Sequence, residues 1–151
     1  MRRMQAMLVL WVILWLASAL QAQPQYTMTD LGTLFPTAIA GPWVVGREPD
    51  FTPVRLNIKT GERLLLPHEG LGAEPTGVLD SGEAVGNVGQ HTAPVGHGPA
   101  AVWDAAGRLG YFPTPRGAQD AWVFGVNAQL AAAGVVYTAA GPGLAALWLL
   151  G

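Results

Sequence analysis

The sequence predicts an all-β fold built from about three repeats, each of four short strands. The chain holds 20 glycines and 12 prolines in 151 residues, which disfavours long helices because glycine costs backbone entropy and proline lacks an N–H donor. Short links that end in glycine, such as Lys59-Thr60-Gly61 and Asp80-Ser81-Gly82, suit hairpins. Val54-Arg55-Leu56-Asn57-Ile58 alternates apolar and polar residues, as a half-buried strand does.

The composition limits the classes of function. Half of the residues are hydrophobic and 12% are charged, so the chain can bury a core. The absence of cysteine excludes thiol catalysis and cysteine-based zinc sites. Without Arg2 and Arg3 the chain has 10 acidic and 6 basic residues, a net charge of −4. Because no basic run remains, nucleic acid is not an expected partner.

The first 22 residues are typical of a secretory signal peptide. Arg2 and Arg3 precede an apolar core, Met7 to Leu16, and small residues follow at Ala17-Ser18-Ala19. We expect cleavage after Ala19 or Ala22, which leaves a β-repeat domain over residues 23–151. A transmembrane anchor is the alternative, but the apolar run is shorter than the ~20 residues that a bilayer span needs. The prediction is therefore a signal helix and a secreted or periplasmic protein that contacts a membrane only through an uncleaved signal.

A repeated pattern organises the rest of the chain into units of roughly 37–67, 75–113 and 121–151. In the clearest copy the predicted strands are Thr76–Asp80, Glu83–Val88, Ala100–Asp104 and Arg108–Phe112. The glycines Gly46, Gly86 and Gly134 recur at intervals of 40 and 48 residues, and Trp103 and Trp148 lie 45 residues apart. These intervals are close to the ~40–50 residue period of four-stranded propeller blades.

The last copy lacks a fourth strand, because the sequence stops at Gly151. The segment Tyr26–Gly32 has no repeat of its own, and its position in the repeat pattern corresponds to that of a fourth strand. We therefore expect Tyr26–Gly32 to close the last sheet, within the chain or in a neighbouring molecule, and so to remove an open strand edge.

Three repeats are fewer than the ~4–8 blades that close a propeller. Two chains could join into a six-bladed ring, so a homo-oligomer is one expectation. A single chain could form a partial propeller, and a β-trefoil-like barrel of twelve strands is the alternative.

At these motifs the chain resembles the HAF-type probable extracellular repeat family. Thr29 to Leu34 resembles the DLGTL hallmark of that family, and Gly77 to Gly86 and Gly125-Val126-Asn127 resemble its G-I-N-x-x-G-x-V-V-G segment. Ala101-Val102-Trp103 is similar to its A-F-x-W. The DLG element is intact only once. The resemblance implies an exported, propeller-like array of sheets with no accepted activity to carry over.

The aromatic residues divide into two groups. Trp103 and Trp148 occupy equivalent repeat positions, which predicts core residues. Trp43 and Trp122 break the repeat pattern, so they are candidates for a platform that stacks on a carbohydrate or holds a protein ligand.

No catalytic site is predicted, and neither a cofactor nor a metal is expected. Ser81 lies in a turn without the frame of a serine hydrolase. His91 and His97 share one long loop and are weak binding candidates, but a metal site needs three or four converging ligands. The expected function is a non-catalytic recognition or structural module. The alternatives are an envelope hydrolase or metal-dependent enzyme that uses the His91–His97 loop, and a fragment of a longer repeat protein.

Overall fold

The computed structural model describes residues 28–89, 98–139 and 141–149, in which eleven strands and no helix occur. The chain divides into Met1–Leu31 and Gly32–Gly151, and all strands belong to the second unit. The all-β prediction is confirmed. The predicted signal segment lies outside the described residues, among which no helix could span a membrane.

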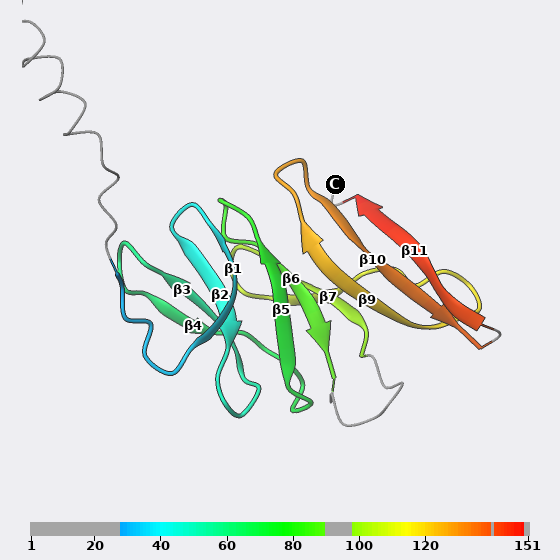
Figure 1. The fold of residues 1–151 in the computed structure, drawn as a ribbon, viewed down its shortest axis with the longest axis horizontal. Coiled ribbons are helices and arrows are strands. Elements are labelled where there is room, and N and C mark those ends of the chain that lie inside the picture. Colours follow the sequence, from blue (N-terminus) through cyan, green and yellow to red (C-terminus); the bar gives the residue numbers. More distant parts are fainter. Residues whose placement is uncertain (1–27, 90–97, 140, 150–151) are drawn as a thin grey trace, which may run out of the picture. The chain divides into compact units, whose positions relative to one another are not determined.

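The strands form three antiparallel sheets, and within each sheet the spatial order follows the chain (Figure 1). The first sheet contains β1 (Phe35–Ala40), β2 (Trp43–Arg47), β3 (Pro53–Asn57) and β4 (Arg63–Leu65). The second contains β5 (Ala73–Val78), β6 (Ala84–Val88), β7 (Ala100–Trp103) and β8 (Leu109–Tyr111). The third contains β9 (Ala118–Val126), β10 (Ala131–Thr138) and β11 (Gly141–Leu149).

The recurring glycines have a common structural cause. In each sheet the first strand carries a β-bulge, and a glycine of the second strand lies opposite it. A Cβ at Gly46, Gly86 or Gly134 would overlap the carbonyl group of Phe35, Glu74 or Trp122, respectively. Only glycine lets the bulged strand approach this closely, so the spacing in the sequence marks equivalent positions in three sheets.

The first strand of the second sheet begins three residues before the predicted one, at Ala73 and not at Thr76. The strand includes Pro75, although proline cannot donate to a ladder of hydrogen bonds. In the structure the register shift of β5 falls between Pro75 and Gly77. Pro75 therefore sits at the bulge, a position that sheets allow for proline.

The predicted closing segment, Tyr26–Gly32, is only partly described. Met28 to Leu31 form no strand, and a turn begins at Gly32. Tyr26 and Thr27 lie outside the described residues, so closure by this segment stays a prediction.

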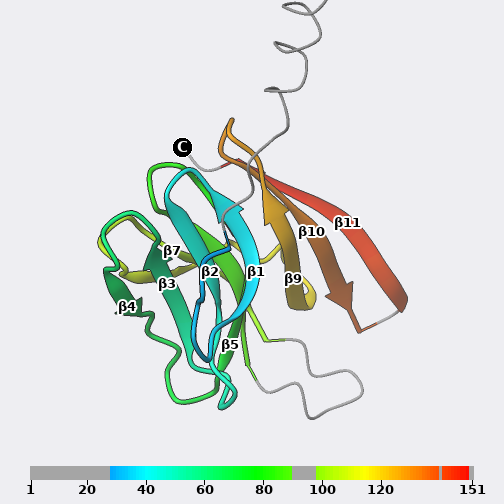
Figure 2. The same cartoon turned by 60° about the vertical axis from the view of Figure 1, so that its left-hand side comes forward.

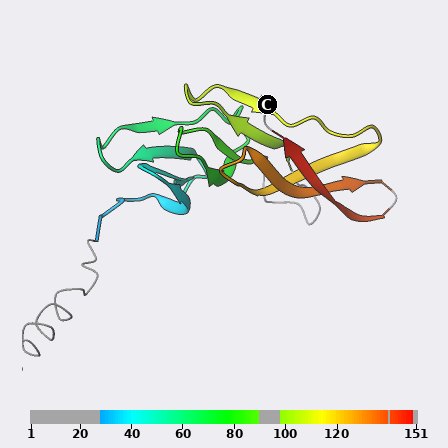
Figure 3. The same cartoon turned by 90° about the horizontal axis from the view of Figure 1, so that it is seen from above.

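Two hydrophobic clusters join the sheets, and the second sheet lies between the other two (Figure 3). The cluster between the first and second sheets includes Val45, Leu66 and Trp103. The cluster between the second and third includes Phe112, Val123 and Trp148. Trp103 and Trp148 are 0% and 8% exposed, which confirms the prediction that they are core residues.

Candidate functional site

The first strands of the three sheets end around one pocket of about 420 Å³. Ile39, Val78 and Val126 occupy equivalent register positions near the ends of β1, β5 and β9, and all three line it. The other lining residues are Ala40, the last residue of β1, and residues of the connections that follow β5 and β9: Leu79, Asp80, Ser81, Ala128 and Leu130. Each of the three repeats therefore contributes to this surface, which we call the strand-end pocket.

The polar groups of the strand-end pocket come from the turn between β5 and β6. The backbone N–H of Leu79 donates to the backbone carbonyl of Glu83 at 2.9 Å, and the N–H of Gly82 donates to the backbone carbonyl of Leu79 at 2.9 Å. This turn places Asp80 and Ser81 at the rim, where the Ser81 hydroxyl donates to the Glu83 carboxylate. Among the described residues, the lining includes no histidine, lysine or arginine. The described lining thus offers an apolar floor, one carboxylate and one hydroxyl, and it places no imidazole or amine beside Ser81.

A buried arginine holds the first sheet against the second. Arg55, on β3, is 4% exposed and donates to the carbonyl groups of Gly82, Asp104 and Ala105. Its guanidinium group lies 4.8 Å from the centre of the Trp43 ring. Burial lowers the pKa of Arg55. Three carbonyl acceptors and an aromatic face offset the cost of removing this cation from water.

A buried amide has the same role between the second and third sheets. The Asn87 side chain on β6 donates to the Val123 carbonyl at 3.0 Å and accepts from the Val123 N–H at 2.8 Å. The Thr76 hydroxyl donates to the same Val123 carbonyl at 3.0 Å. At the junction of the first and second sheets, the Thr37 hydroxyl likewise donates to the Pro75 carbonyl. Figure 2 shows β5, which carries Thr76, beside β1 and β9.

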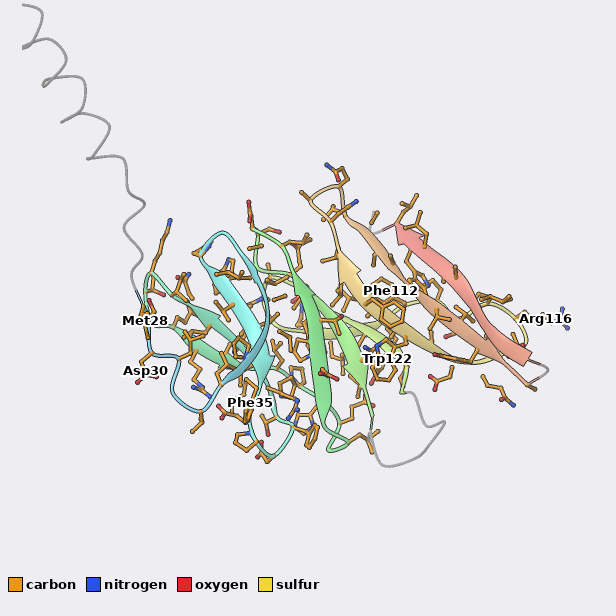
Figure 4. All side chains as sticks on the ribbon, in the orientation of Figure 1. Met28, Asp30, Phe35, Phe112, Arg116 and Trp122 are labelled. Atoms are coloured by element: carbon orange, nitrogen blue, oxygen red, sulfur yellow. The ribbon has the colours of Figure 1, made fainter. Side chains whose placement is uncertain are left out.

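A second link recurs at both junctions. The indole N–H of Trp103 donates to the Pro67 carbonyl at 2.8 Å, and that of Trp148 donates to the Pro113 carbonyl at 3.1 Å. Each proline lies two residues beyond the fourth strand of the preceding sheet. Phe112, which is labelled in Figure 4, reinforces the second junction. Its ring centre lies 5.1 Å from that of Trp148.

The candidate binding residues from the sequence are not brought together in the described part of the chain. Trp43 is half-buried between Arg55 and Gly82, where a Cβ on Gly82 would lie 3.1 Å from the indole. Trp122 is half-buried on β9 and pairs with Val135 of β10. His91 and His97 lie outside the described residues.

The roles of Asn87, Arg55, Thr37 and Thr76 between the sheets were not predicted from the sequence. A signal for the threonines was present, since the pair Pro-Thr recurs at Pro36-Thr37 and Pro75-Thr76. Asn87 and Arg55 gave no comparable signal, because the other repeats have different residues at the equivalent positions.

Metal-binding geometry is absent from the part of the chain that the structure describes, where no three histidine, aspartate or glutamate side chains cluster. His68, the histidine of the described segments, accepts a hydrogen bond from the Gly72 N–H at its Nδ1 atom. It therefore shapes a turn.

A second hollow, of about 540 Å³, lies between the 113–118 segment and strands β10 and β11. Its walls are mostly apolar and include Val136, Leu144 and Trp148, with Arg116 as the charged residue. Its walls come from the third sheet and from the segment that leads into it, whereas all three sheets contribute to the strand-end pocket.

Comparisons with protein-family models, curated proteins and solved structures find no match to this chain.

Proposed function

We propose that this chain is an exported, non-catalytic β-repeat module that binds its ligand at the strand-end pocket. The observation that carries the proposal is the convergence of three equivalent strand ends on one pocket. Pockets with an apolar lining and a few oriented polar groups are the usual sites of recognition. The described side chains around this pocket suit binding better than bond cleavage, because the base beside Ser81 is the Glu83 carboxylate and no described imidazole or amine lines the pocket to complete a catalytic set.

The packing that we propose for the sheets is propeller-like. Every strand pairing joins strands of the same repeat. Separate sheets that meet through their faces are typical of propellers, whereas a trefoil-like barrel would need pairing between repeats. This packing agrees with the fold implied by the resemblance to the HAF-type repeat family, to which we propose that the chain belongs.

The chemistry of the pocket indicates a class of ligand. Ile39 and Leu130 offer an exposed apolar surface, while Asp80 and Ser81 offer hydrogen-bond acceptors and a hydroxyl. A sugar ring combines an apolar face with hydroxyl donors and fits both features. We therefore propose a carbohydrate of the cell envelope as the ligand, with an apolar segment of a protein as the competing class.

Binding can be tested with purified peptidoglycan and with soluble oligosaccharides derived from it. We expect the wild-type protein to bind, and Asp80→Asn and Ile39→Ser to weaken binding about tenfold or more, because they remove a charged acceptor and an exposed part of the floor. Asp50→Asn is the matched control, since Asp50 lies in a turn outside the pocket and its side chain accepts from Thr52. Equal binding by all three variants would exclude the strand-end pocket.

Export is a separate part of the proposal and has its own test. Expression from Met1 in a bacterial host should yield an extracytoplasmic protein whose mass corresponds to cleavage after Ala19 or Ala22. Replacing Arg2 and Arg3 by glutamate should trap the precursor, because the positive n-region orients a signal peptide. A full-length protein that stays in the cytoplasm without processing would contradict export.

A further inference from the structure

Two arginines of the first sheet lie against aromatic rings, but they differ in their hydrogen bonds. Arg55 on β3 is buried, and its guanidinium group donates to three backbone carbonyls. Arg47, the last residue of β2, is half-buried, and among the described residues it has neither a hydrogen-bond acceptor nor an ion-pair partner for its guanidinium group. A guanidinium group carries five N–H donors, so those of Arg47 can bind an acceptor from outside the chain.

Two phenylalanine rings position the Arg47 side chain. Phe35, the first residue of β1, pairs with Arg47 across the ladder, and its ring centre lies 5.5 Å from Arg47 Cζ. The ring of Phe51, from the turn between β2 and β3, has its centre 4.2 Å from the same atom. Both rings attract the cation, and they are 53% and 38% exposed. Figure 4 labels Phe35. We call Phe35, Arg47 and Phe51 the arginine platform.

Phe51 has a backbone conformation that a bulky residue seldom adopts. Its φ angle is +66°, in the left-handed region, where glycine is the usual residue. The turn fixes this conformation, because the N–H of Phe51 donates to the Glu48 carbonyl at 3.0 Å and its own carbonyl accepts from the Ala73 N–H at 3.0 Å. Glycine would remove the strain but also one ring beside Arg47. Strained residues of this kind cluster at ligand sites.

The carboxylates nearest to Arg47 in the sequence have other partners. The Glu48 side chain forms an ion pair with Arg63. The Asp50 side chain accepts from the Thr52 N–H at 3.0 Å, and this backbone hydrogen bond lowers the pKa of the Asp50 carboxyl. Neither carboxylate forms an ion pair with Arg47, so the arginine platform presents a positive charge between exposed apolar rings.

We propose that the arginine platform binds an acidic carbohydrate, with Arg47 on a carboxylate of the sugar and the two phenylalanine rings against the apolar face of the sugar ring. The planar fork of a guanidinium group matches a carboxylate and can form two parallel hydrogen bonds with it. Exposed aromatic rings supply flat apolar surface at the same place. A uronate carries both features, a carboxylate and an apolar ring face, in one sugar unit.

The arginine platform is separate from the strand-end pocket. Phe35 begins β1, whereas Ile39 and Ala40 at the other end of that strand line the pocket. A strand rises about 3.3 Å per residue, so the two ends of β1 lie roughly 17 Å apart. The Asp80 carboxylate in the strand-end pocket repels an anion. The two sites therefore select ligands of different charge, and neither depends on the other.

Isothermal titration calorimetry with trigalacturonate tests the proposal on the gene product, expressed from Met1 and purified in the form that the cell retains. The wild-type protein should bind, and Arg47→Gln and Arg47→Lys should each weaken binding about tenfold or more, because glutamine lacks the charge and lysine lacks the planar fork. Arg108→Gln is the matched control, since it removes the same charge from an arginine that is 83% exposed and paired with Asp104. A wild-type protein that does not bind, or equal binding by Arg47→Gln, would overturn the proposal.

The Phe51→Gly variant separates a binding role of the ring from a structural one. Glycine adopts a positive φ without strain, so the thermal midpoint should stay near that of the wild type. Binding of trigalacturonate should nevertheless weaken about tenfold or more, because one of the two rings is lost. A variant that loses stability but binds trigalacturonate as the wild type does would show that the ring only supports the turn, and would overturn its place in the site.

Two further measurements identify the site and the class of ligand. Ile39→Ser removes part of the strand-end pocket and should leave trigalacturonate binding unchanged, so that a failure of one site is distinguishable from a failure of the other. Tetraglutamate, an acidic peptide without sugar rings, should compete only weakly. Displacement of trigalacturonate by a lower concentration of tetraglutamate would indicate a protein ligand and overturn the assignment to a carbohydrate.

Discussion

At the scale of single residues, the junctions between sheets depend on a few buried polar side chains. Asn87 is 4% exposed and satisfies both the N–H and the carbonyl of Val123. Apolar burial brings the sheets together, but it is non-directional. The amide fixes their register, because its donor and acceptor fit only one residue of β9.

Replacing Asn87 by alanine should lower the free energy of unfolding by about 2–4 kcal/mol, since the Val123 N–H loses the Asn87 acceptor, the Val123 carbonyl keeps only the Thr76 hydroxyl as a side-chain donor, and a small void remains. Urea denaturation followed by fluorescence measures this change. Gln129→Ala, in the exposed turn between β9 and β10, removes an amide of similar chemistry and should change the free energy by no more than about 0.5 kcal/mol. Equal effects of the two substitutions would contradict the assigned role of Asn87.

Tyr111 provides a prediction for the pH dependence. Partial burial, with a hydrogen bond to the Glu69 carboxylate, raises the pKa of its phenol from 10.0 to about 12. The folded state therefore favours the neutral phenol, so this contribution to stability is complete below pH 10 and is lost as the pH rises through about 12.

An ultraviolet titration of the wild-type protein minus that of Tyr111→Phe should isolate a phenol with a pKa near 12. In Glu69→Gln the same difference titration should shift to lower pH, because the carboxylate no longer opposes ionisation. An unchanged midpoint in Glu69→Gln would show that burial alone raises the pKa.

At the scale of strands, one glycine per sheet permits the bulge that turns a threonine or phenylalanine outward. Gly86→Ala should destabilise the protein by roughly 3 kcal/mol or more, because the new Cβ overlaps the Glu74 carbonyl and the bulged strand has to move. Gly110→Ala is the matched control in β8, where a Cβ would lie at an ordinary 3.5 Å from Val102. Unfolding experiments should separate the two variants clearly, and similar stabilities would refute the assigned cause.

The strands themselves were largely predictable from local patterns. Alternating residues place β3, and the glycine-ended turns beside them place β6 and β7, each within about one residue of its observed bounds. The strand around Pro75 begins three residues earlier than predicted. It can include Pro75 because the proline lies at a bulge. The strand-end pocket could not be predicted, because it depends on how three separate sheets pack.

For the whole molecule, stability should be greatest in the middle. The second sheet is covered on both faces, and all five residues of β6 are buried. Amide hydrogen exchange should therefore be slowest in β6 and β7 and faster in β11, where Leu147 and Leu149 are exposed. Slowest exchange in β11 of the monomer would contradict this order.

The two junctions differ in a way that limits how the repeats can be rearranged. Asn87 needs the N–H of Val123, but the equivalent residue of the second sheet is Pro75, which has none. A duplicated middle repeat would place the Asn87 oxygen of one copy against the proline of the next and leave a buried acceptor unsatisfied, at a cost of about 1–3 kcal/mol. Gene duplication or shuffling of whole repeats would thus require a compensating change at this one position. The side chains at the junctions therefore determine the order in which the repeats can follow one another.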